Sequence, residues 1–301
     1  MSRAVRWMDF PKKKIFSIEY FGESELGKTH DALTYPNVAI CDTLSEGEVW
    51  QVAEKFNNPR VFRARTFDDI RRFVNYCIQN PKIESIAIDS GADLREMAEA
   101  EYLGFATPEE LIVRRRGEKK PSVYSPKHGG VEYRHVNNKI DELVNKVKRA
   151  NKYLIITSRV KDEWVKQEAD GETRFVKSGR KIHDGYNKFE YGYGLSVRLW
   201  LVKGITIDGN TYFEDYVFAK VIKNRFVPKR VQKPYIFNHT YQGLVEDGEL
   251  FEIWCKNYDE NKCDINKCVT CPNHEPKDLL EEAKAYLRRI GFLKDEPKSP
   301  K

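Results

Sequence analysis

Short apolar runs alternate with amphipathic segments through the first part of the chain. The runs are rich in β-branched and aromatic residues and predict strands at residues 14–20, 37–42, 60–64 and 83–89. The segments between them have apolar side chains three or four residues apart and predict helices that start at Lys28 or span 47–56 and 67–79. Strands that alternate with helices predict an α/β fold with a mainly parallel sheet covered on both faces.

The pattern changes beyond residue 94. A helical start leads into a basic, glycine-containing stretch at 114–121, and an amphipathic helix is predicted at 137–151. These residues predict an excursion from the core, a basic insertion at roughly 104–136. A buried strand at 153–158 then returns the chain to the sheet.

The residue pattern of the last part of the chain differs from both preceding parts. Residues 172–230 alternate aromatic and β-branched side chains, which predicts antiparallel strands at the sheet edge. A cysteine-rich stretch and a helix at 276–290 follow. We therefore expect a large core at 1–235 and a small appendage, with the cysteines and the terminal helix, at 236–301.

The strongest motif lies between the first predicted strand and the first predicted helix. The segment GESELGKT fits the phosphate-binding loop G-x-x-x-x-G-K-[ST]. Its glycines let backbone N–H groups surround a β-phosphate, Lys28 reaches the β- and γ-phosphates, and the Thr29 hydroxyl is a ligand for Mg²⁺. A chance glycine turn is the alternative, and the strand and helix on either side argue against it. The expected nucleotide-binding residues are Gly22, Glu23, Ser24, Glu25, Leu26, Gly27, Lys28, Thr29 and His30.

A site of this kind also needs an acidic residue at the end of a buried strand, to hold Mg²⁺ through its water shell. Asp89 ends the strand at 83–89 and fits this role, with an exposed strand-end carboxylate as the alternative. The strand at 153–158 is expected beside it. Thr157, Ser158 or Arg159 at its end would then contact the γ-phosphate. Alternatively, Arg159 and Lys161 would serve a neighbouring subunit or be solvated edge residues.

Hydrolysis also requires a group that orients or deprotonates the attacking water. Glu46 and Glu48 lie just past the strand that ends at Asp42, and Asp42 is a third candidate. Each carboxylate has the alternative of a solvated loop position, so the sequence leaves the choice open. The expected catalytic residues are Lys28, Glu46, Glu48 and Asp89.

The order of these pieces resembles the RecA-like P-loop ATPases. Over residues 13–225 the resemblance is closest to the phage nucleotide-binding protein family, and it is carried by the segments IEYFGESELGKT, VAICDTLSEGE, IESIAIDS and KYLIITSRVKDEW. It implies a RecA-like core that binds ATP and Mg²⁺, hydrolyses ATP, and assembles into a homo-oligomer. It also implies a protein of a virus or mobile element that acts on DNA in recombination, replication or packaging. The chain departs from the family at Glu46, which is displaced from the usual Asp-x-Glu arrangement.

The resemblance further implies DNA-binding loops after the strand that ends at Asp89. The matching stretch mixes cations, which bind phosphates, with aromatic rings on which the bases of single-stranded DNA stack. A solvated basic loop without a ligand is the alternative. The residues expected to contact DNA are Arg114, Arg115, Arg116, Lys119, Lys120, Tyr124, Lys127 and Arg134.

A cysteine cluster predicts a second metal site. Cys268 and Cys271 form a C-x-x-C pair, the local geometry in which two thiolates bind one Zn²⁺, and Cys255 and Cys263 complete a set of four sulfurs. The first spacing is longer than in most such sites. Free buried thiols, a disulfide and an iron–sulfur cluster are the alternatives.

Composition bears on the cellular location of the protein and on the kind of partner it binds. No run approaches the ~18 apolar residues of a membrane-spanning helix, and the first residues lack the apolar region of a secretory signal. We therefore expect a soluble protein of the cytoplasm, or of the host cytoplasm if it is viral. The net charge of +6 is compatible with nucleic acid as a partner.

Two other functions remain compatible with the sequence. One is a nucleotide-gated module that binds single-stranded DNA with little turnover, which the displaced Glu46 keeps open. The other is a kinase-like phosphotransferase, in which the basic stretch from Arg114 would form a lid over phosphates. The long β-rich part after residue 170 argues against the smaller kinase architecture.

Overall fold

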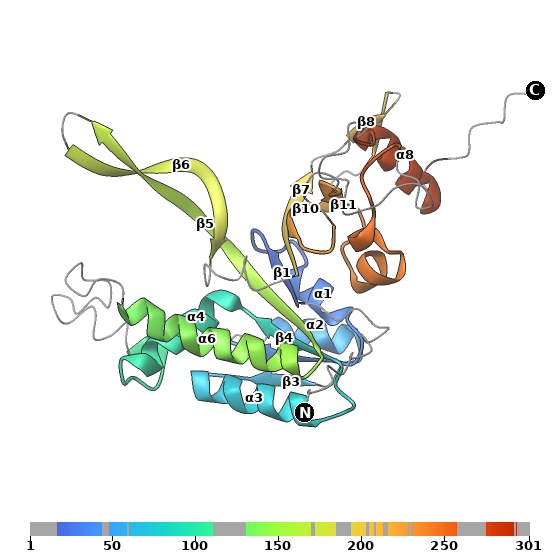
Figure 1. Cartoon of the computed structure of the whole chain (residues 1–301). Helices are drawn as coiled ribbons and strands as arrows, with labels where there is room; N and C mark the ends of the chain where they lie inside the picture. Colours follow the sequence, from blue (N-terminus) through green and yellow to red (C-terminus); the bar gives the residue numbers. More distant parts are fainter. Residues whose placement is uncertain are drawn as a thin grey trace, which may run out of the picture.

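The computed structural model is an α/β structure built on one large, mainly parallel sheet (Figure 1). It describes residues 17–43, 48–58, 60–110, 131–169, 172–184, 194–202, 205–207, 209–212, 216–227, 229, 232–257, 275–291 and 293.

Within these residues the central sheet has nine strands. They are β1 (Ser17–Phe21), β2 (Val38–Asp42), β3 (Val61–Arg63), β4 (Ser85–Asp89), β5 (Tyr153–Ala169), β6 (Glu172–Asp184), β7 (Leu195–Val202), β10 (Tyr216–Asn224) and β11 (Tyr235–Ile236). The order is β11-β10-β7-β1-β5-β4-β2-β3, with β6 paired to β5 beside this path. Neighbours from β7 to β3 are parallel, whereas β10 is antiparallel to both β7 and β11. A separate hairpin joins β8 (Ile205–Ile207) to β9 (Asn210–Tyr212).

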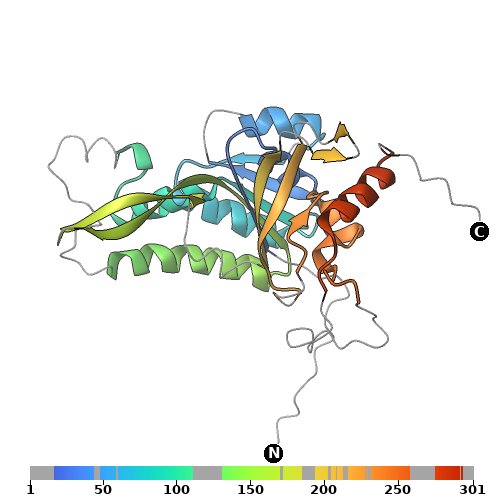
Figure 2. The same ribbon diagram turned by 90° about the horizontal axis from the view of Figure 1, so that it is seen from above.

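Helices cover both faces of the sheet, as the sequence predicts (Figure 2). On one face α3 (Phe67–Gln79), α4 (Gly91–Tyr102) and α6 (Val131–Arg149) pack on β2, β4 and β5. On the other face α1 (Lys28–Leu33) and α2 (Glu48–Lys55) contribute to a second core with β1 and β7. Successive residues of β5 alternate between the cores: Leu154 belongs to the first and Ile155 to the second. Residues 153–158 of β5 are therefore buried on both faces, as expected for a central parallel strand.

The predicted elements of the first half agree closely with the observed ones. The helix predicted at 67–79 is α3, which begins with a capping box between Thr66 and Asp69. The helix predicted at 137–151 is longer and begins at Val131. The strand predicted at 153–158 is also longer, because β5 continues to Ala169.

The second half of β5 leaves the sheet together with β6. Residues 153–158 of β5 pair with β1 and β4, whereas residues 159–169 pair only with β6. The two strands form a twisted hairpin that projects from the body of the protein (Figure 1); residues 159–169 and 172–184 are called the arm below. Within the segment 172–230 that was predicted as antiparallel edge strands, β10 is antiparallel and lies next to the edge strand β11. In contrast, β6 belongs to the arm, β7 is parallel to β1, and β8 and β9 form their own hairpin.

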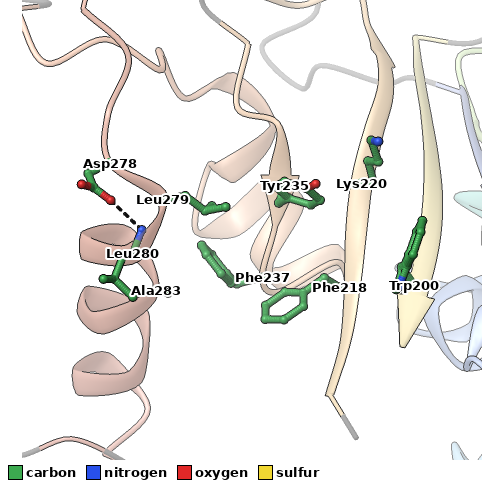
Figure 3. A pocket seen from close by; sticks show the side chains of 9 residues that line it. All are labelled: Trp200, Phe218, Lys220, Tyr235, Phe237, Asp278, Leu279, Leu280 and Ala283. Carbon is green, nitrogen blue, oxygen red and sulfur yellow. Dashed lines mark hydrogen bonds between the residues drawn. The ribbon is translucent and has the colours of Figure 1, made fainter. Parts of the chain in front are cut away.

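The C-terminal segments pack on the outer strands. The π-helix η3 (Gln242–Glu246) and the 3₁₀-helix η4 (Glu249–Phe251) place Leu244 and Leu250 in the core beside α1 and β1. Helix α8 (Leu279–Arg289) begins where Asp278 Oδ1 accepts a hydrogen bond from Leu280 N. A hollow of about 560 Å³, lined mainly by apolar side chains, lies between the first turns of α8 and the outer strands (Figure 3), whereas Tyr286 and Leu287 farther along α8 pack in a cluster with Phe218 of β10. Among the described residues, no helix combines the length and hydropathy that crossing a membrane requires.

Candidate nucleotide-binding site

The loop between β1 and α1 is a tight turn whose two glycines are needed for different reasons. At Gly22, a Cβ would lie 3.0 Å from the carbonyl oxygen of Leu199 on β7, so a side chain would push the loop away from the sheet. At Gly27, φ is +82° and a Cβ would meet nothing within 4 Å, so backbone conformation is the constraint. Glu25 also has a positive φ, of 66°.

The lysine of the motif folds back over its own loop. Lys28 Nζ donates to the carbonyl oxygen of Gly22 at 3.2 Å and also to that of Glu23. Burial lowers the pKa of Lys28. The nearby charge of Asp89 acts against this lowering, and the charge of Arg159 adds to it. The ammonium thus lies inside the turn, where its hydrogen bonds can be exchanged for those of an anionic ligand.

Thr29, the residue after this lysine, contacts Asp89. Thr29 Oγ1 donates to Asp89 Oδ2 at 2.6 Å, and Thr157 Oγ1 donates to Asp89 Oδ1 at 2.5 Å. Strand β5 lies directly beside β4, with Thr157 in register with Asp89, as the sequence predicts. The predicted acidic residue is therefore at the end of its strand and faces the phosphate-loop motif.

Three residues behind Asp89 extend the polar cluster. Thr43 Oγ1 lies 2.8 Å from the carbonyl oxygen of Asp89 and accepts a hydrogen bond from Ser90 N at 2.6 Å. Asp93 Oδ2 accepts from Ser90 Oγ at 2.6 Å and lies 3.1 Å from Thr43 Oγ1. The sequence analysis missed Asp93, although its place one helical turn after Ser90 is a pattern that marks the start of a helix.

The candidates for activating water are in different environments. Asp42 is buried at the end of β2, in register with Asp89. Glu48 is exposed at the start of α2. Glu46 lies outside the described residues. Of the two carboxylates that the structure describes, Asp42 is the one in register with Asp89.

The other residues expected near the nucleotide differ in exposure. Ser158 is buried, and its carbonyl oxygen accepts a hydrogen bond from Gly22 N at 3.2 Å. Arg159 is exposed and close enough to Lys28 to influence its pKa. His30 is exposed and contacts the ring of Phe56 edge-on, with the ring centroids 5.4 Å apart.

A buried glutamate that the sequence analysis missed lies under the loop. Glu19 on β1 has no exposed surface, and it accepts hydrogen bonds from Ser158 Oγ and Ser196 Oγ, each at 3.1 Å. Its Oε1 also lies 2.9 Å from Nδ1 of His183. An acidic residue inside an apolar strand was the available signal, because such a residue requires partners.

A second buried pair joins helix α1 to the C-terminal part of the chain, through Asp31 of the helix and His239. Nδ1 of His239 lies 2.8 Å from Asp31 Oδ2, and its Nε2 lies 3.1 Å from the carbonyl oxygen of Val217. Both ring nitrogens face acceptors, which favours the doubly protonated ring. Burial acts to lower the pKa of His239, but Asp31 and the two hydrogen bonds outweigh it and raise that pKa. Burial raises the pKa of Asp31.

The predicted DNA and zinc residues fall mostly outside the described residues. Of the DNA set, Arg134 is described, and it is exposed on α6. Of the four cysteines, Cys255 is described; it is buried, forms no disulfide, and packs with Val227 and Ile253. No group of three or more His, Cys, Asp or Glu side chains arranged for a metal ion occurs in the described part of the chain. Both predictions stay predictions.

No protein-family model matches this chain, and no curated protein is significantly similar to it. The functional assignment therefore depends on the geometry around the loop.

Proposed function

We propose that the protein binds ATP with Mg²⁺ in the loop between β1 and α1 and hydrolyses it. The observation that carries the proposal is the 2.6 Å hydrogen bond from Thr29 to Asp89. This bond joins the threonine of the loop motif to the acidic end of β4, although the two residues lie 60 positions apart in sequence. A chance glycine turn would give no reason for an acidic strand end to contact the threonine of the motif.

The donor set suits a hard divalent cation. A threonine hydroxyl and a carboxylate supply oxygen ligands of the kind that Mg²⁺ prefers, directly or through water. Thr29 and Asp89 would hold the ion, and the ion would neutralise part of the negative charge of the phosphates. The Lys28 ammonium and the backbone N–H groups of residues 22–27 belong to the same turn as Thr29 and would complete the anion site.

Hydrolysis is proposed over binding alone because a further carboxylate accompanies Asp89. Asp42 is buried in register with it, and Thr43 ties the end of β2 to the backbone of Asp89. A carboxylate within reach of the attacking water would orient or deprotonate it. From the resemblance we further propose that DNA is the partner that stimulates turnover.

Steady-state ATP hydrolysis and equilibrium binding of a fluorescent ATP analogue test the proposal together. Lys28→Ala is expected to abolish both, because it removes the ammonium that faces the phosphates. Lys55→Ala, on the exposed side of α2, is the matched control and is expected to behave as wild type. Unchanged hydrolysis by Lys28→Ala would contradict the site assignment.

A second pair of variants separates binding from chemistry. Asp89→Asn is expected to keep measurable nucleotide binding, lose its Mg²⁺ dependence and lose turnover. Asp42→Asn is expected to lower kcat by about 100-fold or more with little change in nucleotide affinity, as removal of a general base does. Binding without turnover in the wild-type protein, with and without DNA, would favour the nucleotide-gated binding module instead.

A further inference from the structure

The carboxylate of Glu19 joins three strands around one buried charge. Its partners are Ser158 on β5, His183 on β6 and Ser196 on β7. A fully buried carboxylate is strongly unfavourable without donors, so these hydrogen bonds are needed wherever the strand is folded. The positions of the three partners are therefore coupled through Glu19.

One of these partners also holds the phosphate-binding loop. The hydroxyl of Ser158 donates to Glu19, and its carbonyl oxygen accepts from Gly22 N, the first residue of the motif. The ring of His183 packs edge-on to Phe21, with the centroids 6.0 Å apart. Glu19 thus lies between the loop and the base of the arm, which His183 occupies opposite Val160.

The arm depends on its base for its position. Of the arm residues whose exposure the structure describes, His183 is the one that is buried. Side chains farther out are largely exposed, including Trp164 at 56% and Phe175 at 61%. An element with so few buried contacts is free to reorient when its base shifts.

The nucleotide site contains a contact that a bound nucleotide would change. In this structure the Lys28 ammonium donates to the carbonyl oxygens of Gly22 and Glu23. Phosphate oxygens bind an ammonium more strongly than neutral carbonyls do, so nucleotide binding would release both carbonyls. A rearrangement of the loop at Gly22 would reach Ser158, whose carbonyl oxygen accepts a hydrogen bond from Gly22 N at 3.2 Å.

We propose that Glu19 is a positioning residue that couples nucleotide occupancy of the loop to the conformation of the arm. The proposal rests on the proposed function, because it describes regulation of that same site. The coupling runs from Lys28 and Gly22 through Ser158 to Glu19, and from Glu19 to His183. By reciprocity, a partner that holds the arm in one position changes the affinity for nucleotide.

Hydrogen–deuterium exchange of the full-length protein tests the coupling without a label. Exchange in peptides that cover residues 159–184 is measured without nucleotide, with Mg²⁺ and ADP, and with Mg²⁺ and ATPγS. In wild type, saturating ATPγS is expected to change the exchange rate at the base of the arm by about fivefold or more, the usual lower range for coupled sites. Nucleotide affinity is measured in parallel with the fluorescent ATP analogue.

Glu19→Gln keeps the volume of the side chain but removes its charge. The variant is expected to bind nucleotide with affinity within about tenfold of wild type and to lose the arm response. Glu163→Gln makes the same chemical change on the arm itself, where Glu163 Oε2 accepts a solvent-exposed hydrogen bond from Ser178 Oγ at 2.6 Å. This control is expected to keep both nucleotide binding and the arm response. If Glu19→Gln does not fold, His183→Gln is the second variant, with the same expected loss.

Each outcome bears on one proposal or the other. Absence of nucleotide binding in wild type overturns the proposed function. Nucleotide binding in wild type with an unresponsive arm overturns the coupling alone. A full arm response in Glu19→Gln, or in His183→Gln where Glu19→Gln does not fold, shows that the buried cluster has a purely structural role.

Discussion

At the scale of single residues, two glycines have the same backbone conformation in different places. Gly27 in the loop between β1 and α1 has φ of +82°, and Gly179 on the arm has φ of +79°. An added Cβ would meet nothing within 4 Å at either position. Alanine at either site therefore introduces backbone strain without a steric clash, which makes the two substitutions a matched pair.

Gly27→Ala and Gly179→Ala are each expected to lower the free energy of unfolding by about 1 kcal/mol, the cost of a left-handed conformation for a residue with a Cβ. Gly27→Ala is also expected to weaken ATP binding, because the strain changes the loop that holds the phosphates. Urea titration measures the stability, and fluorescence titration measures the affinity. Equal loss of affinity in both variants would mean that strain acts globally and not at the loop.

The buried pair of His239 and Asp31 gives a pH dependence at the same scale. The pKa of His239 is raised above its ordinary 6.5, so the folded state binds more protons than the unfolded state. The stabilisation is fully present below pH 6.5 and is lost as pH rises through the raised pKa. The raised pKa of Asp31 acts with the same sign at lower pH.

His239→Gln is expected to flatten the fall in the free energy of unfolding above neutral pH. His135→Gln, at an exposed position on α6, is expected to keep the wild-type slope. Chemical denaturation between pH 6 and pH 9 measures both slopes. A wild-type slope in His239→Gln would show that the pair does not set the pH dependence.

At the scale of elements, the arm should be separable from the core. Asp162 and Lys181 are opposite each other near its base and form an ion pair at 2.8 Å. Replacing residues 163–180 by Asn-Gly would close the hairpin with a two-residue turn. The shortened protein is expected to fold, to keep its affinity for ATP, and to keep thermal stability close to that of wild type, because none of the removed residues whose exposure the structure describes is buried. A thermal melt and the fluorescence titration measure the outcome, and failure to fold would show that the arm is part of the core.

The sequence predicts core elements better than it predicts the arm for a physical reason. Strand β5 is apolar through Ile156, because both faces are buried there, and the prediction follows it correctly to residue 158. Beyond Arg159 the strand has solvent on both faces, so neither an apolar run nor a clean alternation marks it. What maintains the strand is pairing with β6. The available local signal was the Asp-Gly dipeptide at 170–171, which favours a two-residue hairpin turn and which the prediction did not use.

The candidate site shows the same division between local and distant information. The loop at 22–29 is visible in the sequence because its chemistry requires adjacent residues, and Asp89 is visible because it ends an apolar strand. Thr43 is not, because its role comes from a hydrogen bond between strands that meet only in the fold. Glu19 and Asp93 had local signals, an acidic residue in an apolar strand and a position three residues after Ser90, but the cross-strand partners of Glu19 follow only from the fold.

At the scale of the whole molecule, ATP should stabilise the fold by mass action. Ligand at 100 times its dissociation constant is expected to add about 2.7 kcal/mol to the free energy of unfolding if it binds only the folded state. Lys28→Ala is expected to lose this increment while unfolding like wild type without nucleotide. Thermal melts with and without Mg²⁺ and ATP measure the difference. An equal gain in stability for the variant would mean that the nucleotide binds elsewhere.

The continuity of β5 has a mechanical consequence. One unbroken strand runs from the parallel sheet, beside Asp89, to the outer part of the arm, so tension applied there is delivered to the centre of the protein along a single backbone. Pulling the two arm strands apart would open their hydrogen bonds a pair at a time, whereas drawing β5 out of the sheet along its axis would load its bonds to β1 and β4 together. The two arm strands would therefore separate at a lower force than β5 and its neighbours in the sheet, before the candidate nucleotide site deforms.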